Sequence, residues 1–185
     1  MKTYIKILAV LFTSFIILSC SRDEVPEDIH EHEEIEKVVL TVIDKNDTSN
    51  EQIVNIIGGE ATPNLTLQNG KTYLASLDFQ VKHDDHYHSA NDEIIEEKDE
   101  HFVLFNFIGV DAKVMRGNND VVRTDGKKLG LKTEWTIQGS PNNSKVHIIL
   151  NHGASSVQDN YPSASNQLGS AVGGESDVDV SIKVQ

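Results

Sequence analysis

Three histidines lie within six residues near the middle of the chain, beside two carboxylates. The segment reads His83-Asp84-Asp85-His86-Tyr87-His88. Neutral imidazole nitrogen suits Zn²⁺, Cu²⁺ and Ni²⁺, while carboxylate oxygen extends the range to Mn²⁺ and Ca²⁺. The spacing therefore predicts a loop that binds a divalent cation. We expect zinc first, with Cu²⁺ and Ca²⁺ left open.

A second group of candidate ligands follows within fifteen residues. On a helix, Glu97 and His101 would lie one turn apart on one face and could chelate together. If that helix folds back over the 83–88 loop, both groups could share one ion. The predicted metal ligands are therefore His83, Asp85, His86, His88, Glu97, Glu100 and His101.

The other histidines give weaker signals. His30 and His32 lie in an acidic segment and could capture metal there. His147 alternates with apolar neighbours, so it should face solvent or a neighbouring strand. His152 begins a glycine-containing turn and could approach Asp177 or Asp179. The competing interpretation of the 83–88 segment is a solvated acidic loop whose histidines are incidental.

No enzymatic function is expected. The chain contains no G-x-S-x-G, no phosphate-binding glycine loop and no H-E-x-x-H. Its carboxylates cluster in charged segments without an identifiable apolar cleft to raise a pKa.

The first twenty residues predict export and lipid attachment. Two lysines precede an apolar stretch at 7–18 that is too short to span a bilayer but suits a secretory leader. The leader ends in Leu18-Ser19-Cys20, which resembles the lipobox of bacterial lipoproteins. We expect a signal peptide at 1–19 and acyl chains such as palmitate on Cys20. Ser21, in place of an aspartate, favours the outer membrane; the periplasmic or cell-surface face stays open.

The charge of the chain is unbalanced, and the imbalance is local. There are 29 acidic and 16 basic residues, a net charge of −13, and one cysteine. Residues 20–37 and residues 82–101 each hold eight acids and two bases, or −6 apiece. An acidic excess disfavours nucleic acid, whose affinity comes mainly from Lys and Arg. A single cysteine excludes an internal disulfide.

Apolar residues alternate at period two through most of the remaining sequence, which predicts half-buried strands. The run 73–81 has a clean apolar face, and 102–108 is nearly continuous, as in a central strand buried on both faces. With seven to nine short strands separated by turns, the predicted fold is an all-β antiparallel sandwich of Ig-like or Greek-key topology.

The expected domain organisation follows from these patterns. A flexible tether at 20–36 leads into a β-sandwich domain at 37–185, which carries the His- and acid-rich insertion 82–101. One short helix is predicted at 91–100, with Asn91 as its cap and Ile94 and Ile95 packing beneath. The Ser-, Asn- and Gly-rich stretch 154–174 is expected to be a long exposed loop.

Several segments carry a family resemblance that spans most of residues 20–185. They are the Ser-Cys leader end with its acidic tether, and the stretches 36–42, 70–73, 94–102, 129–135 and 173–180. Together they resemble a family of small Bacteroidota lipoproteins often labelled "type 1 periplasmic binding fold superfamily protein". That label implies a two-lobed α/β protein, whereas the strand pattern predicts an all-β domain. The resemblance also implies a TonB-dependent outer-membrane receptor as a partner.

The sequence therefore predicts an outer-membrane or surface lipoprotein that binds a divalent transition metal and delivers it to a receptor. The alternative is a non-enzymatic surface module that recognises a protein or glycan and has no metal role. Haem binding through paired histidines is a poorer fit, because few aromatic residues flank them.

Overall fold

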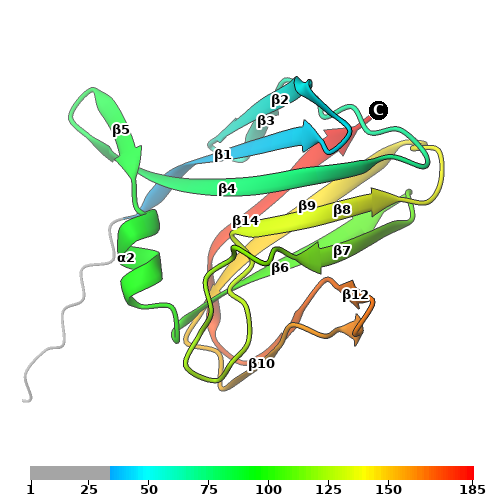
Figure 1. The fold of residues 1–185 in the computed structure, drawn as a ribbon. Coiled ribbons are helices and arrows are strands. Elements are labelled where there is room, and N and C mark those ends of the chain that lie inside the picture. Colours follow the sequence, from blue (N-terminus) through cyan, green and yellow to red (C-terminus); the bar gives the residue numbers. More distant parts are fainter. Residues whose placement is uncertain (1–33) are drawn as a thin grey trace, which may run out of the picture. The chain divides into compact units, whose positions relative to one another are not determined.

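The computed structural model describes residues 34–185 (Figure 1). The expected signal peptide, Cys20, His30 and His32 lie outside the described residues, as does most of the expected tether. The first strand begins at Ile35, two residues before the expected domain boundary at 37. Within residues 34–185, no helix is long and apolar enough to cross a membrane.

The described residues form fourteen strands and one short helix, and eight of the strands have five residues or more. The helix is α2 (Asn91–Glu96). The strands are β1 (Ile35–Asp44), β2 (Asp47–Ile57), β3 (Glu60–Thr62), β4 (Thr72–His83), β5 (His86–Ser89), β6 (His101–Ile108), β7 (Ala112–Arg116), β8 (Lys132–Ile137), β9 (Ser144–His152), β10 (Ser156–Gln158), β11 (Pro162–Ser163), β12 (Asn166–Gln167), β13 (Ser170–Val172) and β14 (Glu175–Val184).

Two principal sheets are present, and their strands pair antiparallel. The seven-stranded sheet has the order β3-β2-β1-β4-β8-β7, with β5 paired to β4. The three-stranded sheet has the order β14-β9-β6. Two small hairpin pairs, β10-β13 and β11-β12, lie outside these sheets. The prediction of a mostly β, antiparallel protein with one short helix is confirmed.

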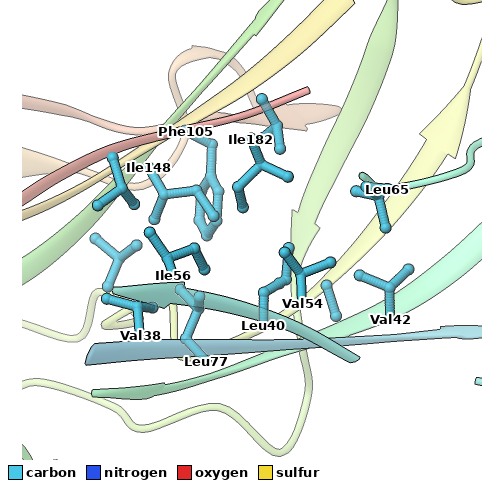
Figure 2. Close-up of a cluster of buried hydrophobic side chains, with 14 of the residues drawn as sticks. Val38, Leu40, Val42, Val54, Ile56, Leu65, Leu77, Phe105, Ile148 and Ile182 are labelled. Carbon is cyan, nitrogen blue, oxygen red and sulfur yellow. The ribbon is translucent and has the colours of Figure 1, made fainter. Parts of the chain in front are cut away.

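Both sheets contribute side chains to one hydrophobic core. Along β4, every second residue from Tyr73 to Val81 is buried, as the alternation predicts. Figure 2 shows Leu40 and Leu77 of the large sheet facing Ile148 and Ile182 of the small one. Fully burying an aliphatic or aromatic side chain contributes about 1.5–3 kcal/mol, so this shared core is the main source of stability.

The prediction that 102–108 is a central strand is wrong. β6 is the last strand of the order β14-β9-β6, and Ile108 at its end is 48% exposed. Its first half is nevertheless buried, because loop segments cover its outer edge: Val103 N–H donates to the Leu129 carbonyl, and Phe105 N–H donates to the Leu168 carbonyl. Loops therefore supply the cover that the continuous apolar run required.

The predicted helix 91–100 is shorter than expected, and Asn91 does not cap it. The helix ends at Glu96, and Ala90 occupies the N-cap position without a side-chain hydrogen bond. Ile94 is buried as expected, but Ile95 is 37% exposed. The Asn91 side chain instead binds β4, accepting from the Phe79 N–H and donating to the Leu77 carbonyl.

The stretch 154–174 is not a simple exposed loop. It contains β10 to β13, folded as two nested hairpins. Its Asn166 side chain accepts a hydrogen bond from the Val114 N–H, and its Gln167 side chain accepts one from the Arg116 N–H. These two amides cover the outer edge of β7, so the stretch is held against the large sheet.

An amide side chain on β2 also holds the loop that contains Thr66. The Gln52 amide donates to the Thr66 carbonyl and accepts from the Thr66 N–H, both at 2.8 Å. The Gln52 side chain thus satisfies both backbone groups of Thr66, and no backbone group of β2 takes part in these two bonds. The Asn91 side chain, by contrast, bonds with the backbone of a strand, β4.

A buried arginine connects the two principal sheets. Arg116, at the end of β7, donates to the carbonyls of Leu129 at 2.8 Å and Val103 at 2.7 Å, and its guanidinium lies 4.2 Å from the Phe102 ring centre. Burial lowers the pKa of Arg116 to about 10, so the group stays charged at neutral pH. A side chain at Gly130 would collide with this guanidinium, and Gly130 also has a positive φ.

We expect Arg116→Met to lower the free energy of unfolding by about 2–4 kcal/mol, because it leaves buried carbonyl groups without their charged donor. Urea unfolding followed by Trp135 fluorescence measures this. Lys113→Met, an exposed change on the same strand, should shift stability by no more than about 0.5 kcal/mol. Equal effects of the two variants would contradict the role given to Arg116.

A second charged contact lies at Asp44, the last residue of β1. Lys71 Nζ lies 2.6 Å from Asp44 Oδ2, and Asn46 N–H donates to the same carboxylate. The Lys71 ammonium and the backbone N–H groups of Asn46 and Asp47 lower the pKa of Asp44 by more than burial raises it. The pKa of Asp44 therefore lies below its usual value.

Because the folded-state pKa of Asp44 is lowered, its contribution to stability is present above the ordinary carboxyl pKa and is lost as the pH falls through the folded-state value. Asp44→Asn should therefore lower the thermal unfolding midpoint at pH 7, and the gap from the native protein should narrow at pH 3. Asp111→Asn, an exposed carboxylate, serves as the control. A gap that is constant with pH would contradict this prediction.

Candidate functional site

The three clustered histidines lie on one β-hairpin, here called the histidine hairpin (residues 83–88). It consists of the end of β4, a turn at Asp84 and Asp85, and the start of β5, and it projects beyond the rest of the large sheet (Figure 1). Asp84 adopts a positive φ of 53°, which Asp tolerates in tight turns. The expected loop is therefore a paired strand tip.

The register of the hairpin places all three imidazoles on one face. His83 pairs with His86 and Val81 pairs with His88, and directly opposed residues share a face in an antiparallel pair. The His83 and His88 rings stack at 4.3 Å between centroids, and the His86 and His88 rings lie 6.2 Å apart. The three rings therefore lie side by side on the hairpin, and their role as metal ligands stays a prediction.

The hairpin also carries a carboxylate beside one imidazole and a tyrosine on its opposite face. Asp85 Oδ1 lies 3.3 Å from His86 Nδ1, so one predicted oxygen donor is beside one predicted nitrogen donor. Tyr87 lies on the other face, where the Lys37 and Lys82 ammonium groups lie 5.2 and 6.0 Å from its ring centre. These cations are therefore on the opposite side from the imidazoles.

The expectation that Glu97 and His101 share a helix face is wrong. Glu97 is the C-cap of α2, and His101 is the first residue of β6. The turn between them is held by other groups: Arg123 donates to the carbonyls of Lys98 and His101, at 2.8 and 2.6 Å. The N–H groups of Glu100 and His101 also donate to the Glu97 carbonyl, which completes the turn.

His101 belongs to a second group at one end of the three-stranded sheet, here called the sheet-end cluster (Glu100, His101, His152 and Asp177). His101 Nε2 lies 3.4 Å from Asp177 Oδ2, and His152 Nδ1 lies 4.0 Å from Asp177 Oδ1. His152 Nε2 lies 3.1 Å from Glu100 Oε2, and the two imidazole rings stack at 4.8 Å. The expected approach of His152 to Asp177 is confirmed.

The strand register explains why these residues meet. His101 opens β6 and pairs with His152, which closes β9. On β14 the register shifts between Ser176 and Val178, so Asp177 is an extra residue in the ladder. Such bulges redirect a side chain. The sequence offered Asp177 and Asp179 equally as partners of His152, because nothing in the local sequence marks the bulge that selects Asp177.

The environment of His101 favours its protonated form. The residue is only 3% exposed, and its Nδ1 lies 3.2 Å from the Glu97 carbonyl oxygen. Burial disfavours the charged imidazolium, but the Asp177 carboxylate and the Glu97 carbonyl together outweigh it. The pKa of His101 therefore lies above its ordinary value.

An acidic groove reaches the sheet-end cluster from outside. It has a volume of about 430 Å³ and lies between β1, the end of β2 and β14. Glu34, Glu36, Asp177 and Asp179 line it, with Lys37 as the basic residue. Four carboxylates against one ammonium make the groove attractive to cations.

The remaining sequence candidates occupy separate positions. His147 pairs across the sheet with a carboxylate, its Nε2 contacting Asp179, which agrees with its expected place facing a neighbouring strand. Across residues 34–185, no three His, Cys, Asp or Glu side chains are already arranged to hold one metal ion. Coordination by either histidine group would therefore require side-chain rotation.

No family model, no curated protein sequence and no solved structure matches this chain.

Proposed function

We propose that this protein is a lipid-anchored β-sandwich of the outer membrane that binds a divalent transition metal, zinc foremost, through the histidine hairpin. The observation that carries the proposal is that His83, His86 and His88 share one face of an exposed hairpin. Imidazole nitrogen is a preferred zinc ligand, and Asp85 places a carboxylate beside His86.

The exposed position of the hairpin suits capture and release. Zinc needs nitrogen ligands at about 2.0–2.1 Å, which these side chains can reach by rotating about their own bonds. No packed core has to move, because the hairpin residues are solvent-exposed apart from the half-buried Tyr87. Glu97, Glu100 and His101 have their described contacts elsewhere, so the proposed capture site consists of His83, Asp85, His86 and His88.

The proposed sandwich rests on the shared core of the two principal sheets. A sandwich of Ig-like or Greek-key type would hold the hairpin on a rigid scaffold. The membrane anchor rests on the leader pattern ending at Cys20, and delivery of metal to a TonB-dependent receptor rests on the family resemblance. A non-enzymatic role agrees with the absence of catalytic motifs from the sequence.

Changing His83, His86 and His88 together to Ala should lower zinc affinity at the hairpin by at least about tenfold, because it removes all three nitrogen donors. Isothermal titration of the detergent-solubilised full chain with Zn²⁺ measures this, with Cu²⁺ and Ca²⁺ as parallel titrants.

His147→Ala removes an imidazole from elsewhere in the fold and should leave the zinc titration unchanged. If the triple variant binds zinc as the native protein does, the hairpin is not the capture site.

A second candidate function is favoured by a groove on the large sheet. It has a volume of about 380 Å³ and includes Ile43, Leu74 and Glu134, and Leu74 is 42% exposed. Such a surface suits a non-enzymatic module that recognises a protein or glycan.

Co-purification from detergent-solubilised outer membranes, with and without EDTA, separates the two functions. Metal-dependent delivery predicts that the receptor is lost from the complex in EDTA. A partner retained equally in chelator, and lost on Leu74→Asp, would favour the recognition module instead.

A further inference from the structure

The two imidazoles of the sheet-end cluster direct one nitrogen each toward the same carboxylate. His101 Nε2 and His152 Nδ1 lie 3.4 and 4.0 Å from the two oxygens of Asp177. Direct hydrogen bonds of this kind are shorter, about 2.7–3.2 Å. Donor atoms bound to one tetrahedral zinc ion, each about 2.0–2.2 Å from it, are about 3.3–3.6 Å apart. The first separation therefore fits two ligands of one ion, and the second approaches that fit.

The other nitrogen of each ring contacts an oxygen. His101 Nδ1 lies 3.2 Å from the Glu97 carbonyl, which accepts only if this nitrogen carries the proton. His152 Nε2 lies 3.1 Å from the Glu100 carboxylate, which likewise accepts. In the neutral rings these bonds leave the lone pairs on His101 Nε2 and His152 Nδ1. Metal-binding histidines are held in this way by carbonyl or carboxylate partners.

Burial and charge agree with this arrangement. His101 is 3% exposed, whereas Asp177 lines the acidic groove and is therefore reachable from solvent. Glu97 also has a buried carboxylate oxygen without a hydrogen-bond partner in the described part of the chain. A bound cation would offset this concentration of negative charge.

We propose that His101 Nε2, His152 Nδ1 and Asp177 form a zinc-class metal site at the end of the three-stranded sheet, separate from the histidine hairpin. Glu100 and the Glu97 carbonyl orient the two rings, and water from the groove completes the coordination. Because the two rings stack with only 20° between their planes, the His152 ring must turn out of this stack, and Asp177 must rotate, before the three donors can meet on one ion.

The test uses the full chain in mild detergent, stripped with EDTA, in which His83, His86 and His88 are all changed to Ala. Titration with Zn²⁺ should still show about one bound equivalent, and zinc should raise the thermal unfolding midpoint, because a ligand that binds only the folded state stabilises it. Adding Asp177→Asn or His152→Gln should weaken this binding at least about tenfold and abolish the thermal shift.

Asp179→Asn is the matched control, because Asp179 lines the same groove but contacts His147. It should leave the remaining zinc equivalent in place. Unfolding in EDTA shows whether each variant is folded, and His101 is left intact because its burial makes substitution disruptive.

The inference is overturned if the hairpin variant binds no zinc, or if the remaining binding is indifferent to Asp177→Asn and His152→Gln. The cluster would then be an ion pair that only stabilises the fold. The results distinguish this proposal from the proposed function. Loss of all zinc binding in the triple variant supports the hairpin and refutes the sheet-end site. Unchanged zinc binding that depends on Asp177 supports the sheet-end site and refutes the hairpin.

Discussion

The buried guanidinium of Arg116 is the contact on which the arrangement of the two sheets depends. Arg116 is the last residue of β7 in the large sheet, and its guanidinium donates to the Val103 carbonyl on β6 of the small sheet. His101 lies two residues before Val103 on the same strand, so this bond also fixes where His101 lies. A second guanidinium, from Arg123, binds the His101 carbonyl directly. The position of the imidazole is therefore set by two cations that do not themselves contact its ring nitrogens.

Local pattern predicted the individual strands well, and long-range pairing poorly. Half-buried strands such as β4 and β14 alternate between core and solvent, which the sequence shows directly. The apolar run of β6 indicated burial on both faces, but an equally apolar strand can be covered by loops. α2 was predicted too long because its acidic continuation suits a helix. The carbonyls beyond Glu96 are instead held in a turn, by arginine contacts that no local pattern reveals.

The sequence could predict the histidine hairpin but not the whole sheet-end cluster, because the residues of the cluster are far apart along the chain. The hairpin residues are adjacent in sequence, so spacing alone placed them together. His101, His152 and Asp177 come from three distant strands and meet only through the register of β6, β9 and a bulged β14. The groups also differ physically: one is exposed and adjustable, while the other is largely enclosed and reached through an acidic groove. Proposed metal exchange at the first and retention at the second would follow from this difference in access.

The amide side chains that replace missing strands have a consequence for how the molecule behaves in a crowded compartment. The Asn91 side chain accepts from the Phe79 N–H and donates to the Leu77 carbonyl, both on β4. Asn166 and Gln167 cover β7. An open sheet edge offers unpaired N–H and C=O groups to any extended chain nearby. Here those groups are already taken at several places by residues of the same molecule. These side chains thus leave fewer backbone groups of β4 and β7 open to pairing with another chain.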